Sequence, residues 1–126
     1  MQKTSLLLIL ILWCAPAFAE EGRQKWGKRL WLASIAAVAA GSALDVHSSL
    51  GKYENNGLLA NRQGVFSMQG IGIKLAIAGA AVGTQHYLLR KNPTATGYRT
   101  GTLINFAVAG ALGGVAVHNY GNHVAR

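Results

Sequence analysis

The chain has 126 residues, of which 51% are hydrophobic and only 13% are charged, and its formal net charge is +8. A typical soluble domain has roughly 25% charged residues, so this chain has about half the charge expected of a soluble surface. Its length allows one domain. Its single cysteine, Cys14, lies in the N-terminal apolar run, which excludes disulfides, thiol nucleophiles and thiolate metal sites in the rest of the chain.

The N-terminal residues have the pattern of a secretory signal peptide. Lys3 supplies a positive start, an unbroken apolar run follows, and residues 15–19 end in the A-x-A pattern that signal peptidase cleaves. We therefore predict a signal peptide at 1–19 and a single helical membrane domain at 20–126. The mature chain is expected to begin at Glu20.

Three apolar segments without proline follow, at about 30–46, 71–89 and 102–120. Each has nearly the roughly 20 residues with which a helix crosses a bilayer. Alanine and glycine add little insertion energy and Lys74 adds a charge, so the second helix should insert only when it is paired with a neighbour. The predicted fold is all-α: a small three-helix membrane bundle with Ala/Gly-rich helices. A soluble or peripheral helical bundle is the alternative.

Small residues recur at every fourth position in all three segments. Such spacing makes a flat face that another helix backbone can approach closely. The residues predicted to pack helices in this way are Ala37, Gly41, Gly79, Gly83, Gly110 and Gly114. Packing within the chain and self-association both stay open, so the expected partners are membrane lipid and either a second copy or another membrane protein.

Basic residues fall in short groups beside the apolar segments, as at 23–29 and 90–91. Basic groups at the ends of apolar helices are typical of contacts with anionic lipid headgroups. A strongly basic chain can also bind nucleic acid. Here the basic residues form no stripe along a helix face, and an exported protein rarely meets nucleic acid, so no such partner is expected.

An up-down path of three helices brings the end of the first, the start of the second and the end of the third to one side. The polar side chains of these ends and of the intervening loop would form a cluster there: Asp45, His47, Glu54, Asn56, Lys74, His118 and Asn119. Ionisable residues in membrane segments are functional candidates. At the opposite side, Gln85 and Asn105 are predicted to hydrogen-bond across a short turn.

Three interpretations of this cluster stay open. We favour an ion pair between Asp45 and Lys74 that joins two helices and lets both enter lipid. A metal or ligand site is the second, because carboxylate and imidazole groups suit zinc and similar ions. The spacing matches no known metal motif, so no metal ion and no cofactor are predicted. A proton or ion relay is the third.

Residues 45–59 read DVHSSLGKYENNGLL. This stretch resembles a pattern in small uncharacterised bacterial membrane proteins, in which an Asp ends the first helix and an E-x-N-P-L-like run follows in the loop. Here Gly57 replaces the proline. The resemblance implies membership in a bacterial membrane family without an assigned activity. It transfers no catalytic role. From the signal and the apolar segments, we expect the exported chain to lie in the bacterial inner membrane.

The chain contains no G-x-S-x-G, H-E-x-x-H or P-loop motif, so the sequence favours a protein that is not an enzyme. The predicted function is structural or interaction-based, carried out by a small exported integral membrane protein. The first alternative is a small ion- or proton-conducting oligomer, whose polar faces would turn toward a shared centre. The second is a membrane-embedded metal-dependent enzyme, with Asp45, Glu54 and His118 within metal-binding distance.

Overall fold

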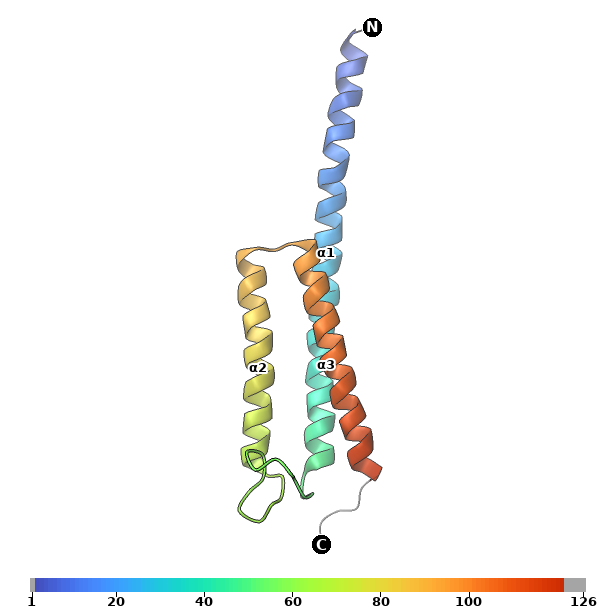
Figure 1. Ribbon diagram of the computed structural model, residues 1–126. Helices are drawn as coiled ribbons and strands as arrows, with labels where there is room; N and C mark the ends of the chain where they lie inside the picture. The colour runs from blue at the N-terminus through green and yellow to red at the C-terminus, as the bar shows by residue number, and fades with distance from the viewer. Residues whose placement is uncertain (1, 122–126) are drawn as a thin grey trace.

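The computed structural model describes the backbone of residues 2–121 and the side chains of residues 20–121. Over this range the chain forms three helices and no regular strand: α1 (Gln2–Ser49), α2 (Met68–Lys91) and α3 (Ala95–Gly121). The predicted all-helical fold is therefore confirmed. The backbone of the predicted signal peptide continues into α1 without a break (Figure 1), and its side chains lie outside the described ones.

Each helix is longer than the apolar segment from which it was predicted, and α3 begins well before residue 102. Its first turn is capped by Thr94, whose Oγ1 accepts the Gly97 N–H at 3.0 Å. Pro93 precedes this cap in the turn after α2. Hydropathy marks only the apolar middle of a helix, whereas backbone hydrogen bonds and caps decide where it ends.

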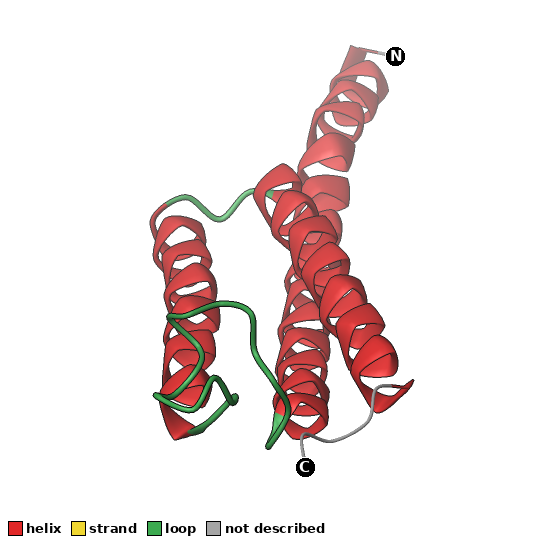
Figure 2. Ribbon diagram, turned by 60° about the horizontal axis from the view of Figure 1, so that its bottom comes forward, coloured by secondary structure: helices red, strands yellow, loops and turns green. Residues whose placement is uncertain are grey.

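The helices α1 and α3 run parallel and side by side, while α2 runs antiparallel to both and stands apart (Figures 1 and 2). Most contacts between helices join α1 and α3. Their register is constant, because Ser34 meets Asn105 and Ser48 meets Asn119, each pair 71 positions apart in the chain. The fold is therefore a long parallel helix pair to which α2 is attached at a few points.

Apart from Trp31 and Val38, the α1 side of the seam with α3 consists of small and polar residues. In α1, six buried positions are spaced alternately by three and four residues, the repeat of a coiled-coil seam: Trp31, Ser34, Val38, Gly41, Asp45 and Ser48. At position 41, an added Cβ would lie 3.1 Å from the carbonyl oxygen of Ala109 in α3. Small seam residues thus let the two backbones approach closely.

Loop 50–67 packs against the first turn of α2 through the side chain of Phe66. An isolated antiparallel bridge joins Ala60 to Phe66 within the loop. The Phe66 side chain is buried against Gly70, where an added Cβ would lie 2.5 Å from the aromatic ring. A side chain at position 70 would displace the ring, so this glycine is what lets the loop dock beneath α2.

Two helices are long and apolar enough to cross a membrane, α1 over Glu20–Ser49 and α3 over Ala95–Gly121. This finding weakly favours membrane association. Within the described residues α2 is not among them, although the sequence predicted three such segments. Lys74, Gln85 and His86 lower the hydropathy of α2, and its alanines and glycines do not compensate.

Candidate functional site

Five polar residues form what we call the lower cluster, at the end of the bundle where α1 ends, α2 begins and α3 ends: Asp45, Ser48, Ser49, Lys74 and Asn119. Within it, Lys74 Nζ lies 2.6 Å from Asp45 Oδ2. The Asp45 side chain is 2% exposed and that of Lys74 is 23% exposed. Lys74 Nζ also lies 4.8 Å from the centroid of the Phe66 ring. The ion pair expected from the sequence is present, and it joins α1 to α2.

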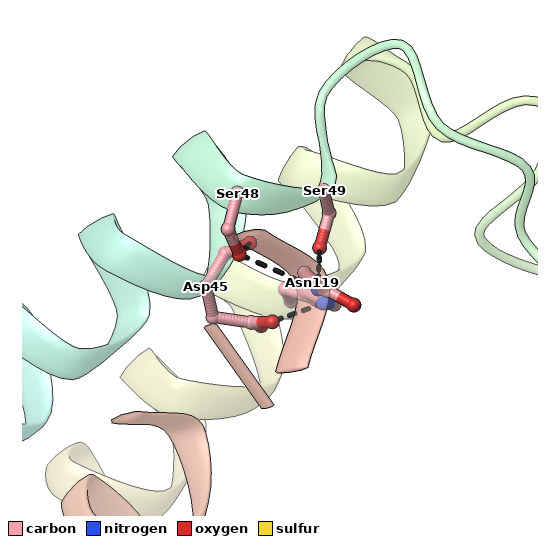
Figure 3. Close-up of polar contacts among 5 residues, drawn as sticks. Asp45, Ser48, Ser49 and Asn119 are labelled. Atoms are coloured by element: carbon pink, nitrogen blue, oxygen red, sulfur yellow. Dashed lines mark hydrogen bonds and ion pairs between the residues drawn. The ribbon is translucent and has the colours of Figure 1, made fainter. Parts of the chain in front are cut away.

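The lower cluster also joins α1 to α3 through Asn119 (Figure 3). Asn119 Nδ2 donates to Ser49 Oγ at 2.9 Å and to Ser48 Oγ at 3.3 Å. Ser48 Oγ in turn donates to the backbone oxygen of Asp45 at 3.0 Å. The second carboxylate oxygen of Asp45, Oδ1, is buried and has no hydrogen-bond donor among the described side chains. The cluster thus touches all three helices.

A second group of polar residues, the upper ring, joins the same three helices further along: Trp31, Ser34, Gln85 and Asn105. Trp31 Nε1 donates to Gln85 Oε1 at 2.9 Å, and Gln85 Nε2 donates to Asn105 Oδ1 at 2.8 Å. Asn105 Nδ2 donates to Ser34 Oγ at 3.0 Å. Ser34 Oγ donates to the Trp31 carbonyl oxygen at 2.7 Å, which closes the circuit. The predicted Gln85–Asn105 hydrogen bond is confirmed.

Gly101 in α3 makes room for the upper ring. An added Cβ there would lie 2.9 Å from Trp31 Cδ1 and 3.1 Å from Gln85 Oε1. Beside the ring, Trp31 packs with Leu89 and Tyr98 in the buried apolar cluster of this region. Buried polar networks stabilise a fold when their members are satisfied, and here four side chains satisfy one another at the edge of an apolar cluster.

The two histidines of the predicted cluster lie in different surroundings. His47 Nδ1 is 2.8 Å from the Tyr120 hydroxyl on the exposed side of α1. His118 and Glu54 line a cavity of about 270 Å³ together with Lys74 and Asn119 of the lower cluster. Among the described side chains, no group of three or more His, Cys, Asp or Glu could hold a metal ion. The arrangement of Asp45, Glu54 and His118 that a metal-dependent enzyme requires is therefore not assembled there.

Two residues of the predicted cluster shape the loop between α1 and α2. Glu54 Oε1 accepts the Asn56 N–H at 3.0 Å. Asn56 Oδ1 accepts the Leu58 N–H at 3.1 Å, as in an Asx turn. The E-x-N-x-L spacing on which the family resemblance depends thus corresponds to two successive side-chain-to-backbone hydrogen bonds.

The small residues expected to pack helices lie in two kinds of environment. Gly41 is buried against Ala109 and Leu112 of α3, and Ala37 is half-buried in α1. Four further glycines would have no described atom within 4 Å of an added Cβ: Gly79, Gly83, Gly110 and Gly114. The GxxxG face of α3 is therefore open, whereas Gly79 of α2 lines a groove of about 500 Å³ between α1 and α2.

Sequence reasoning missed two members of the upper ring, Trp31 and Ser34. The signal that reveals them is the alternating spacing of three and four residues that continues from Trp31 through Asp45 to Ser48. An apolar repeat is not visible at these positions, because serine and aspartate occupy half of them and membrane helices turn such residues inward.

The chain matches no known protein family, no curated protein and no solved structure. The resemblance of residues 45–59 to small bacterial membrane proteins gains no support from these comparisons. Function must therefore be inferred from the polar contacts and the exposed surface of the bundle.

Proposed function

We propose that this chain is a small integral membrane protein with a structural or interaction role, exported through its N-terminal signal and inserted in the bacterial inner membrane. In this proposal α1 and α3 cross the bilayer in the same direction. Because they are parallel, the chain has to return through the bilayer between them, and α2 is the segment that can do so. Lipid and either a second copy or another membrane protein are the proposed partners.

The observation that supports insertion is the burial pattern: many polar side chains are buried and many large apolar side chains are exposed, which is unusual for a water-soluble bundle. The buried polar side chains of the described region are Ser34, Ser42, Asp45, Ser48, Ser49, Thr102 and Asn105. Large apolar side chains are exposed along the helices, among them Leu30, Leu32, Leu44, Leu75, Ile77, Leu88, Leu103, Ile104, Phe106, Val108, Val115 and Val117. Water would penalise so much exposed apolar surface, whereas lipid tails accept it.

Contacts in the lower cluster and in the upper ring explain how α2 could enter lipid despite its low hydropathy. Its lysine is neutralised by Asp45 in the lower cluster, and Gln85 is hydrogen-bonded to Trp31 and Asn105 in the upper ring. An unpaired charge at a helix centre costs about 2.5–3.5 kcal/mol in insertion, so pairing offsets much of the penalty. The polar side chains of the ring bind one another, which favours a scaffold over an open ion pathway.

The length of α1 supports removal of the signal. Its 48 residues correspond to about 72 Å of helix, more than twice the roughly 30 Å of hydrocarbon in a bilayer. A straight helix of this length cannot hold both of its apolar stretches in one bilayer, because residues 20–29 between them are polar and basic. Cleavage after Ala19 would leave a helix of ordinary membrane length.

A charge placed on the exposed apolar face of α3 tests insertion. Val108 lies near the middle of α3 and is 43% exposed. A Val108→Lys variant should leave the membrane pellet after carbonate washing, since a central lysine costs about 2.5–3.5 kcal/mol in lipid. Thr100→Lys, near the start of α3, is the matched control and should stay in the pellet with the wild type, because its side chain can reach the headgroups.

If the protein were a soluble bundle, the carbonate wash would release the wild type, and both lysines would be ordinary surface residues. Release of the wild type would contradict the proposal. Identical behaviour of the Val108→Lys and Thr100→Lys variants would also contradict it. The N-terminus of the pelleted wild-type protein should be Glu20, which Edman sequencing can establish. An intact Met1 on the membrane-bound protein would contradict cleavage.

A further inference from the structure

Three parts of the sequence that carry basic residues come together at the end of the bundle where α3 begins: the middle of α1, the end of α2 and the first turns of α3 (Figure 1). The turn after α2 lies against α1 there, because Gln24 Nε2 donates to the Pro93 carbonyl oxygen. Tyr98 of α3 also lies close to Gly27, where an added Cβ would be 3.1 Å from the tyrosine Cβ. We call this group the basic collar: Arg23, Lys25, Lys28, Arg29, Arg90, Lys91 and Arg99.

Exposed aromatic rings accompany the collar. The Arg29 guanidinium lies 5.6 Å from the centroid of the Trp26 ring, and Lys91 Nζ lies 4.7 Å from that of Tyr87. Trp26 is 64% exposed and Tyr87 is 56% exposed. Aromatic rings beside basic groups at the end of apolar helices are typical of the membrane–water interface. Exposed apolar side chains of the helices adjoin these rings, and such side chains fit contact with lipid better than contact with nucleic acid.

A groove of about 810 Å³ lies between α1 and α3 within the collar. This volume falls in the range of ligand pockets, about 300–1,000 Å³. Arg23, Arg99 and the carboxylate of Glu20 line it, and its apolar lining includes Trp26, Leu30 and Leu103. Arg23 pairs with Glu20 at 2.9 Å, but both side chains are more than 60% exposed, and such pairs are weak. Within the described residues, Arg99 makes no salt bridge.

We infer that this groove binds one anionic phospholipid, with the phosphate between Arg23 and Arg99 and an acyl chain along the apolar lining. Guanidinium groups bind phosphate with matched geometry. Ala95 and Thr96 at the start of α3 also line the groove, and the positive end of the helix dipole favours an anion there. The combination of two cations with an apolar wall fits a lipid better than a free anion. The inference rests on the proposed membrane insertion.

The test compares two pairs of substitutions in the purified full-length mature protein. Arg23→Gln with Arg99→Gln removes two charges from the groove. Lys28→Gln with Arg90→Gln is the matched control, because it removes two charges from the same collar outside the groove lining. Native mass spectrometry counts the phosphatidylglycerol and phosphatidylcholine molecules retained, and a thermal melt with each added lipid measures stabilisation.

The wild type should retain one phosphatidylglycerol and no phosphatidylcholine, and the control pair should do the same. The groove pair should bind phosphatidylglycerol about thirty-fold more weakly, since each basic residue near an anionic lipid contributes about fivefold. Equal loss in both pairs would mean diffuse attraction and would overturn the site. Equal stabilisation by inorganic phosphate or by a short DNA duplex would overturn the assignment to lipid.

Failure of the inference can be told apart from failure of the proposed function. A wild-type protein that stays in the carbonate-washed pellet but retains no phosphatidylglycerol contradicts only the lipid site. A wild-type protein that leaves the pellet contradicts membrane insertion, and with it the basis of the lipid site.

Discussion

Asn105 of α3 donates a hydrogen bond of 3.0 Å to Ser34 of α1, and the same relationship recurs 14 residues further along both helices. There Asn119 donates to Ser48 at 3.3 Å. In both places the serine hydroxyl also donates to the carbonyl oxygen three residues earlier in α1. Fourteen residues are two heptads, so the two contacts face the same seam. The paired contacts hold α1 and α3 in one parallel register.

Replacing Asn105 should loosen the upper ring. The Asn105→Leu substitution nearly conserves side-chain volume. It removes the hydrogen-bond acceptor of Gln85 Nε2 and the donor to Ser34 Oγ, so both polar groups lose a partner inside the bundle. We expect a loss of about 1–3 kcal/mol in the free energy of unfolding, measured by denaturation in detergent. The control is Thr84→Val, whose hydroxyl bonds only to the backbone of its own exposed helix face. Equal effects of both substitutions would contradict a role for the ring.

The ion pair between Asp45 and Lys74 should respond asymmetrically to the removal of each partner. Lys74→Ala leaves a carboxylate that is 2% exposed without its cation, and we expect a loss of about 3–5 kcal/mol in unfolding free energy. Asp45→Ala should cost less, because the Lys74 side chain is 23% exposed and can turn toward water or headgroups. Equal losses would show that the difference in burial has no energetic effect.

The double substitution Asp45→Leu with Lys74→Leu separates a pairing role from a catalytic or relay role. Replacement of both charges by apolar residues is often nearly neutral, so folding should recover to near the wild type in the same detergent denaturation. Additive losses would rule out the pair as the stabilising unit. Recovery of folding without recovery of a cellular phenotype would keep Asp45 as a functional residue.

Gly41 should tolerate a larger side chain far less than Gly110. Gly41→Leu forces the seam apart, since even a Cβ there lies 3.1 Å from the Ala109 oxygen and 3.3 Å from Leu112 Cβ. We expect a loss of about 1–3 kcal/mol in unfolding free energy. At position 110 an added Cβ would have no described atom within 4 Å, so Gly110→Leu should be neutral or stabilising by up to about 1 kcal/mol. If Gly110→Leu instead shifts the oligomeric state on size exclusion, the open GxxxG face contacts a second copy.

The sequence by itself determined the helical fold and its order. Long runs of alanine, leucine and glycine without proline left little alternative to helix beyond residue 29, and the Asn92-Pro93 pair favours a turn between the second and third helices. The alternating path placed Asp45 near Lys74 and Gln85 near Asn105, because both pairs sit at matching ends of neighbouring helices. These contacts could be anticipated since topology alone brings them close.

Only the tertiary structure decided which faces meet. Every helix here carries small residues on several sides, so composition could not tell that Gly41 lies in the seam while Gly79 and Gly110 stay open. The surroundings of the predicted polar residues likewise depend on packing: Glu54 and His118 line one cavity with Lys74, whereas the Asp45 carboxylate is buried and pairs with the Lys74 ammonium. Contacts between helices depend on rotation about each axis and on register, and both are settled by packing across the whole seam.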